Sequence, residues 1–374
     1  MPKISSTFCP AKWDEVHVNL NYNYVYSCCK ATPLKFVNNI DEVLGQQKEN
    51  LLNGVQDSSC SYCWKNENAG QLSLRQEMLD GFDVTTYSQY EDNTIEPKLF
   101  EINLGNECNF QCTYCNPKFS SQWESDVKQK PYEVFSDRHF YAIDQKNSNT
   151  VENTIDWLTR VNSIETLLVM GGEPLLNKNF FRIIESPKSD YLSFTTNLSC
   201  KTTAPIDKIF KAAPNYKTIF LNISIDSTED NAEFTRYGMN YELLLSNIRY
   251  VLTNAPTNVT ITFLSLMTSV TIRDLTNTAK LMDTLYAINN NISWTLSICQ
   301  FPMIMQLTTL PDEYKPEILQ TLTEMLDKPY INYANLVMGN LQSSKFNNTL
   351  YQGLKHFLNE FSIRKNIAIP ICLK

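Results

Sequence analysis

LFEINLGNECNFQCTYC occupies residues 99–115 and joins an apolar strand candidate directly to three closely spaced cysteines. Leu99–Leu104 has the apolar character of a buried strand. Cys108, Cys112 and Cys115 follow it at Cx3Cx2C spacing, so they lie on one tight loop. The chain therefore places three thiols just beyond the end of a predicted strand.

Five further apolar strand candidates follow along the chain: Thr166–Met170, Tyr191–Thr196, Thr218–Ile225, Val259–Leu266 and Ile292–Ile298. Helical patterns lie between them, and one face of such a pattern carries Leu244, Ile248, Val251 and Leu252. Repeated strand–helix units predict an α/β fold with a parallel sheet and right-handed crossovers. Six units fit either an open (β/α)6 barrel or a doubly wound sheet, and spacing alone leaves both open.

Composition divides the chain into three predicted parts. Residues 1–95 are polar and rich in Cys, Tyr and Asn, and they are expected to have little core of their own. Alternating apolar residues at 16–20 predict a strand that turns at 21–23 into a hairpin, and a helix is expected over 40–52. Residues 96–310 carry the strand–helix units, interrupted by a polar insertion at 126–150, and residues 311–374 are expected to form a C-terminal helical extension.

The charge balance and the cysteine usage narrow the class of protein. The formal net charge is −8, which argues against broad nucleic-acid binding through a basic face. No stretch approaches the roughly 20 apolar residues that cross a bilayer, so a cytoplasmic location and no membrane partner are expected. Eight of the 11 cysteines fall in the first 115 residues. In a reducing compartment, cysteines are metal ligands, catalytic thiols or buried small residues more often than disulfides.

The Cx3Cx2C loop suits an iron–sulfur cluster. Three thiolates on one loop can bind three corners of a cubane and leave the fourth iron without a protein ligand. Such an open position is where a metal can do chemistry. A zinc knuckle would supply a fourth ligand close by, and the nearest candidate, His139, lies in the polar insertion. The pattern favours a cluster, with zinc or inert thiols as the alternatives.

This arrangement, with Tyr114 as the aromatic residue before the last cysteine, resembles the CxxxCxΦC hallmark of the radical S-adenosylmethionine (SAM) superfamily. The resemblance implies a partial TIM barrel with its site at the carboxyl ends of the strands. It also implies a 4Fe–4S cluster on Cys108, Cys112 and Cys115 that chelates SAM through its open iron. Reductive cleavage of SAM would then give a 5′-deoxyadenosyl radical that abstracts hydrogen from a substrate.

Supporting motifs follow the later strands. Gly171-Gly172-Glu173-Pro174 resembles the superfamily's GGEP motif, in which glycines allow close approach and the glutamate can receive an ammonium group. Taken alone it is an ordinary turn. Thr196 and Asn197 resemble the start of a Thr-Asn-Gly element, with Leu198 in place of the glycine.

Ser224 and Asp226 end the fourth strand, and Arg236 follows. The resemblance implies that the serine contacts the SAM ribose and the arginine the SAM carboxylate. The alternative is a helix cap at Asp226 or Ser227 and a surface salt bridge at Arg236. The residues expected to bind SAM are Tyr114, Gly171, Gly172, Glu173, Pro174, Thr196, Asn197, Ser224, Asp226 and Arg236.

Cys9, Cys28, Cys60 and Cys63 form a second set, and four thiolates can enclose a metal centre completely. The set resembles a twitch domain, the half-length form of the SPASM auxiliary-cluster domain, placed before the barrel as in N-terminal twitch radical SAM proteins. Asn23 replaces a glycine of that pattern, which left-handed backbone geometry tolerates. Spacing to Asn23 favours Cys28 over Cys29 as the ligand. The resemblance implies a second 4Fe–4S cluster that relays electrons, and zinc is the alternative.

Cys200 and Cys299 follow the third and sixth strands, where a barrel active site opens. Either could donate a hydrogen atom to a substrate radical, and inert packing is the alternative. His17 is expected on the surface. The leading hypothesis is oxidation of a peptide or small polar substrate, with an electron donor such as flavodoxin or ferredoxin. An epimerase, a C–C or C–S bond-forming enzyme, and a non-catalytic zinc- or cluster-binding protein are the alternatives.

Overall fold

The computed structural model describes residues 4–35, 40–93, 96–135, 149–161, 163–185 and 189–373. Within these ranges one sheet has the strand order β12-β11-β10-β8-β7-β6-β4-β1-β2-β3. Its strands are β1 (Glu15–Asn19), β2 (Tyr24–Tyr26), β3 (Leu34–Lys35), β4 (Leu99–Asn103), β6 (Ile164–Met170), β7 (Ser189–Thr196), β8 (Thr218–Ser224), β10 (Val259–Met267), β11 (Ile292–Ile298) and β12 (Ile331–Asn332). Neighbours from β1 to β12 run parallel, and only β2 and β3 are antiparallel additions. The predicted α/β fold with a largely parallel sheet is confirmed.

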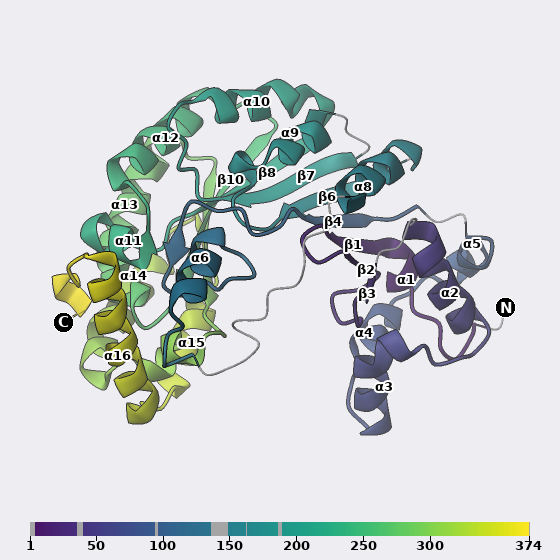
Figure 1. The fold of residues 1–374 in the computed structure, drawn as a ribbon, viewed down its shortest axis with the longest axis horizontal. Coiled ribbons are helices and arrows are strands. Elements are labelled where there is room, and N and C mark those ends of the chain that lie inside the picture. Colours follow the sequence, from purple (N-terminus) through teal and green to yellow (C-terminus); the bar gives the residue numbers. More distant parts are fainter. Residues whose placement is uncertain are drawn as a thin grey trace.

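The six strands predicted from apolar runs are β4, β6, β7, β8, β10 and β11, and they stand side by side in chain order. A doubly wound sheet reverses its strand order at a switch point, and these six strands do not. Figure 1 shows helices following one another along the outer side of the curved sheet: α8 (Asn149–Arg160), α9 (Lys178–Glu185), α10 (Ala204–Ala212), α12 (Tyr241–Asn254) and α13 (Leu275–Ile288). The predicted apolar face of α12 is buried as expected.

The N-terminal hairpin extends this same sheet. Strand β1 pairs in parallel with β4, with Val16 opposite Phe100, and in antiparallel with β2. The turn between β1 and β2 holds Asn23 in the left-handed region at φ 57°, as its replacement of glycine predicts. Helix α2 spans Ile40–Leu52, matching the prediction.

Two features of the N-terminal part differ from expectation. An aromatic cluster of Phe8, Trp13, Tyr87 and Tyr90 is buried there, so this part has more core than its polar composition predicted. The predicted surface position of His17 is also wrong, because β1 is an interior strand between β2 and β4. Only 2% of His17 is exposed.

His17 lies between two carboxylates. Its Nε2 is 3.0 Å from Glu15 Oε2, and its Nδ1 is 3.2 Å from Glu101 Oε2. Burial opposes a charged imidazole, but hydrogen bonds to Glu101 and Glu15 outweigh it and raise the pKa of His17 to about 9. A charged pair therefore links β1 to β4 at the joint between the two regions.

Residues after 311 are mostly helical, with α14 (Lys315–Met325), α15 (Ala334–Ser343) and α16 (Asn348–Lys365). Aromatic side chains of α16 pack on Trp123 of α6 (Ser121–Gln129). The expected insertion at 126–150 begins inside α6, and much of the rest, with His139, lies outside the described residues. In the described ranges, no helix combines the length and apolarity needed to cross a bilayer.

Candidate active site

The three cysteines of the Cx3Cx2C loop line one cavity of about 230 Å³ at the carboxyl ends of β4, β6, β7 and β8. Eight of the ten residues expected to bind SAM line it as well: Tyr114, Gly171, Gly172, Glu173, Thr196, Asn197, Ser224 and Arg236. The other two, Pro174 and Asp226, are buried but are not part of this lining. Because parallel strands end at one edge of a sheet, motifs spread over more than 100 residues meet here.

Glycines at the end of β6 allow its loop to close onto the cysteine loop. Gly171 and Gly172 have φ values of +96° and +39°, in the region that side chains rarely adopt. A Cβ on Gly171 would lie 2.4 Å from Asn103 Oδ1, and one on Gly172 would lie 2.2 Å from Glu107 O. The next residue, Glu173, donates its backbone N–H to Glu107 O at 2.7 Å. These glycines are thus required for contact between two loops as well as for access to a ligand.

The Glu173 carboxylate, only 3% exposed, ties β6 to β7. Its Oε1 accepts from Thr196 Oγ1 at 2.6 Å and from the Leu175 N–H at 3.0 Å. Its Oε2 accepts from the Asn197 N–H at 2.6 Å. Burial raises the pKa of Glu173, and the three donors oppose that shift. The carboxylate therefore already has protein partners on both oxygens, which fix the walls of the cavity.

Leu198, which stands where the related motif has glycine, adopts a left-handed conformation at φ 51°, which glycine favours. It is buried, and its backbone N–H donates to Thr196 Oγ1 at 2.9 Å. Asn197 Nδ2 donates to Asn109 Oδ1 of the cysteine loop at 2.9 Å. Hydrogen bonds thus hold both Asn197 and Leu198 in place at the end of β7.

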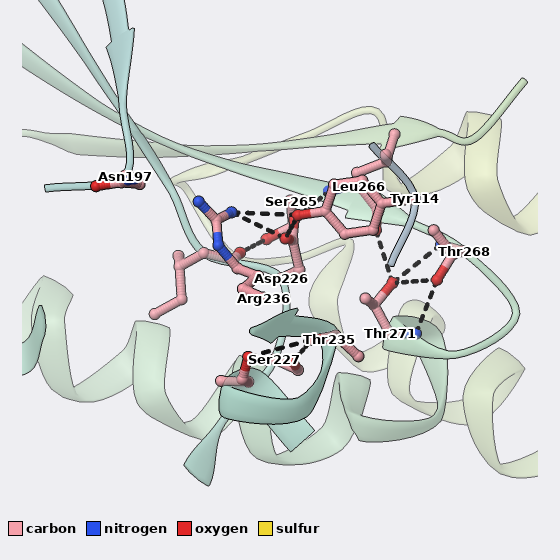
Figure 2. Close-up of polar contacts among 12 residues, drawn as sticks. Tyr114, Asn197, Asp226, Ser227, Thr235, Arg236, Ser265, Leu266, Thr268 and Thr271 are labelled. Atoms are coloured by element: carbon pink, nitrogen blue, oxygen red, sulfur yellow. Dashed lines mark hydrogen bonds and ion pairs between the residues drawn. The ribbon is translucent and has the colours of Figure 1, made fainter. Parts of the chain in front are cut away.

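Figure 2 shows a buried polar network beside the cysteine loop, made by Tyr114, Asp226 and Arg236. Arg236 Nη1 lies 3.0 Å from Asp226 Oδ2, and the side chains of the arginine and aspartate are only 5% and 2% exposed. Tyr114 Oη donates to the same carboxylate oxygen, and Asp226 Oδ1 accepts from the Leu266 N–H at 2.7 Å. The two short strands β5 (Gln111–Cys112) and β9 (Arg236–Tyr237) pair antiparallel and place Arg236 opposite Cys112.

The alternative of a helix cap and a surface salt bridge is wrong. Helix α11 (Glu229–Thr235) begins after Thr228, and Ser227 Oγ contacts Thr235 Oγ1 at 3.3 Å instead of capping it. The Asp226 carboxylate is occupied by the network just described. Its ion pair with Arg236 is buried, where it is desolvated and sensitive to loss of either partner.

The cysteine loop is held from behind by α6. Trp123, fully buried, donates Nε1–H to Cys112 O at 2.8 Å. Ser120 Oγ donates to Phe110 O at 2.6 Å, and the Phe110 N–H donates to Cys108 Sγ at 3.4 Å. Ser120 and Trp123, which follow the loop in sequence, therefore help to hold it in place.

The residues of this cavity fit a cluster with SAM. The donor set is three thiols on one loop, and burial raises the pKa of Cys108 to about 12, so its thiolate form needs a bound metal. Within the part of the chain that the structure describes, the buried Nε–H of Arg236 also has no hydrogen-bond partner, so it is available to a ligand. Among the described residues, no group of three His, Cys, Asp or Glu side chains is arranged to hold a single metal ion.

Three apolar residues of the lining were not predicted as site residues: Phe110, Phe119 and Met170. Phe110 is buried, whereas Phe119 and Met170 are exposed. The signal for Met170 was its place as the last residue of β6, directly before the glycines. Phe119 follows the cysteine loop and has no comparable pattern.

The four N-terminal cysteines line a second cavity. Cys9, Cys28, Cys60 and Cys63 meet there, although up to 54 residues separate them in sequence. Cys28 is buried in this lining, whereas Cys29 is exposed. Three cations, Lys12, Lys30 and Arg75, complete the polar part of the wall.

Cys200 and Cys299 are not among the residues that line either cavity. Both are buried. Cys299 Sγ donates to Phe301 O at 3.3 Å, and burial raises the pKa of Cys200 to about 12. Their role as hydrogen-atom donors stays a prediction.

Comparison with known proteins gives one family match and several distant likenesses. GTP 3',8-cyclase from two strains of Staphylococcus epidermidis is 28% identical over 160 residues, which is 40% of this chain. The chain spans about two fifths of the length of these curated relatives, since the match covers 40% of each.

Two solved structures of SuiB from Streptococcus suis are also similar to this chain, with low sequence identity and low TM-scores. SuiB bound to S-adenosylmethionine is 12% identical with a TM-score of 0.39, covering 88% of this chain and 72% of SuiB. SuiB bound to the precursor peptide SuiA is 11% identical with a TM-score of 0.40, covering 84% and 70%. TM-scores below 0.5 leave these as distant likenesses.

The family match falls on the region that builds the first cavity. It runs from Ile102 in β4 to Met282 in α13, and it includes the Cx3Cx2C loop, the GGEP loop and the Asp226–Arg236 pair. The family implies a 4Fe–4S cluster and SAM. Residues 102–282 of this chain therefore match the radical SAM superfamily.

Proposed function

We propose that this protein is a radical SAM enzyme that abstracts a hydrogen atom from a peptide or small polar substrate and oxidises it. The observation that carries this is the meeting of three thiols with the GGEP loop, Thr196, Asn197 and Ser224 around one cavity. When bound and reduced, the cluster with SAM supplies a carbon-centred radical capable of this abstraction.

The protein's own residues hold and shield that chemistry. Cys108, Cys112 and Cys115 would ligate the cluster. The backbone of the glycine loop and the side chains of Asn197 and Ser224 would contact SAM. Arg236, fixed in place by Asp226, would present its remaining Nε–H to an anionic group of the ligand.

The proposal also assigns roles to the curved sheet and to the N-terminal cysteine region. The sheet from β4 to β11 would act as a partial (β/α)6 barrel, and residues 1–95 as a twitch-like unit with a second 4Fe–4S cluster. The gathering of Cys9, Cys28, Cys60 and Cys63 around one cavity supports this. Zinc is the alternative occupant. An electron donor such as flavodoxin or ferredoxin and a cytoplasmic location stay predictions.

Oxidation is favoured over epimerisation by the position of the remaining thiols. An epimerase needs a hydrogen-atom donor at its substrate. Within the described residues, Cys200 and Cys299 do not line the cavity of the Cx3Cx2C loop. A cluster saturated by four thiolates, in contrast, can accept the electron that an oxidation releases.

The direct test is anaerobic. Protein reconstituted with iron and sulfide is reduced in the presence of SAM, and 5′-deoxyadenosine is measured. The wild type should form it, and Cys112→Ala should not. Cys29→Ala is the matched control, because this exposed cysteine lies outside both cavities and its loss should change nothing. Absence of 5′-deoxyadenosine from the wild type under strong reductant would contradict the proposal.

Metal analysis tests the two occupants separately. Two 4Fe–4S clusters give about eight irons per chain, and one cluster with a zinc site gives about four. A value near zero would mean that the chain is not an iron–sulfur protein.

A further inference from the structure

Lys12 is a buried cation in the wall of the N-terminal cavity. It belongs to α1 (Ala11–Asp14), is 1% exposed, and lines the cavity together with the four cysteines. Its Nζ donates to Gln47 Oε1 at 3.3 Å. Of the ion pairs within 4.0 Å among the described residues, none includes Lys12.

Gln47 fixes this lysine relative to the cysteines. Its Oε1 also accepts from Ser27 Oγ at 3.2 Å, and its Nε2 donates to Ser59 Oγ at 2.7 Å. Ser27 and Ser59 directly precede Cys28 and Cys60. One neutral amide on α2 therefore connects Lys12 to two of the segments that carry thiols, without neutralising its charge.

The charges of the other two cations in the wall are balanced by a carboxylate in one case and solvated by water in the other. Arg75 donates to both oxygens of Glu67, at 2.9 and 2.7 Å. Lys30 is exposed to water and lies over the Tyr62 ring, 5.3 Å from its centroid. Lys12 thus differs from both, since it is buried and no carboxylate contacts it.

A buried charge is costly unless an opposite charge compensates it. Among the described residues that line this cavity, only the four cysteines can carry negative charge, as thiolates. The Asp57 carboxylate, which also interacts electrostatically with Lys12, lies outside the lining and is bound by Asn50 and Ser59. Lys12 follows Cys9 by three residues, its backbone N–H donates to Cys9 O at 3.3 Å, and its side chain lines the same cavity as the four cysteines. Lys12 is therefore placed to stabilise negative charge on these sulfurs.

We propose that Lys12 is the buried counter-charge of the N-terminal metal centre and raises its reduction potential. This rests on the second cluster proposed above. Reduction of a four-thiolate cluster adds one negative charge, and a fixed cation in a poorly solvated site stabilises that added charge. The electron would come from the substrate radical as it loses a proton to become product, and it would leave to a one-electron carrier protein.

The test compares two lysines in the same wall. In full-length protein carrying Cys108→Ala, Cys112→Ala and Cys115→Ala, only the N-terminal centre remains. Lys12→Met and Lys30→Met each remove one charge in this background, the first from a buried side chain and the second from an exposed one. Anaerobic redox titration followed by electron paramagnetic resonance gives the reduction potential, and iron analysis gives the loading.

The potential of Lys12→Met should shift clearly to more negative values, whereas that of Lys30→Met should stay near the parent because water screens Lys30. All three proteins should hold about four irons per chain. Equal potentials at equal iron content would overturn the role of Lys12 and leave the cluster intact. Zinc in place of iron in the parent would overturn the second iron–sulfur cluster together with the role of Lys12. Failure of the Lys12 role alone can therefore be distinguished from failure of the cluster. If Lys12→Met is insoluble, Lys12→Gln removes the same charge and should show the same shift.

Discussion

The two cysteine sites differ in how many ligands the protein supplies and in how it balances charge around them. The first has three thiols on one eight-residue loop, and its cation, Arg236, is paired with Asp226. The second has four thiols from three separate segments, and its buried cation, Lys12, donates to the Gln47 amide and forms no ion pair within the described residues. As proposed, the first arrangement would leave one coordination position of a cluster open to a ligand beside a charge-balanced wall. The second would enclose its metal completely, and the charge of Lys12 would act on that metal centre.

The largest effects are expected when one proposed metal ligand is removed from each site, because this tests directly whether the two sites differ in function. Cys112→Ala should abolish 5′-deoxyadenosine formation. Cys63→Ala should keep it while losing product formation, because the second site is proposed to take part only after hydrogen abstraction. Each variant should lose about four of about eight irons. Loss of 5′-deoxyadenosine in well-folded Cys63→Ala would mean that the sites do not act separately.

Breaking the balanced pair at the first site should destabilise the fold. Asp226→Ala leaves Arg236 buried without its carboxylate, which we expect to lower the free energy of unfolding by about 3–5 kcal/mol. Asp156→Ala is the matched control, because it removes an exposed i,i+4 pair with Arg160 and should cost about 0.5 kcal/mol. Anaerobic urea unfolding measures both. Equal losses would show that the Asp226 pair is no more important than a surface pair.

The joint between the two regions should respond to pH. The folded pKa of His17 is about 9, raised from 6.5 by its two carboxylates against burial. Its stabilising contribution is therefore complete below pH 6.5 and lost as pH rises to about 9, up to about 3 kcal/mol. Thermal unfolding between pH 6 and 9.5 measures this. His17→Gln should flatten the dependence in that window, and an unchanged slope would mean that another group titrates there.

A smaller effect is expected from the glycine loop of the first site. Gly172→Ala places a Cβ 2.2 Å from Glu107 O at a φ of +39°, which should cost about 1–3 kcal/mol and weaken SAM binding. Gly45→Ala in helix α2 meets no atom within 4 Å and should instead stabilise by about 0.5–1 kcal/mol. Isothermal titration with SAM and urea unfolding separate binding from folding. Normal SAM affinity in Gly172→Ala would show that the loop contact is not needed for binding.

Much of the first site could be predicted because most of its residues directly follow the ends of strands that the sequence indicates. Buried parallel strands appear as apolar runs, and the motif after each run reaches the same edge of the sheet. The Asp226–Arg236 pairing was harder, because it depends on two-residue strands, β5 and β9, that leave no periodic pattern. His17 was placed wrongly because its burial comes from β4, about 84 residues away in sequence.

The second site was predictable only in its ligands. Four cysteines with the right spacing indicate a metal centre, and the turn at Asn23 indicates the hairpin that carries Cys28. The burial of Lys12 has no local signal, because a lysine in a polar four-residue helix is normally solvated. Its environment is set by Gln47, which lies on a different helix.

Strands β1 and β4 run side by side in parallel, with Glu15 opposite Leu99 at one end and Asn19 opposite Asn103 at the other. Cys9 precedes the start of β1, and Cys108 follows the end of β4, so these two cysteines flank opposite ends of the strand pair. At about 3.3 Å per residue, five residues hold those ends about 16 Å apart. If both cysteine sites hold clusters as proposed, an electron that passes between them would travel alongside β1 and β4.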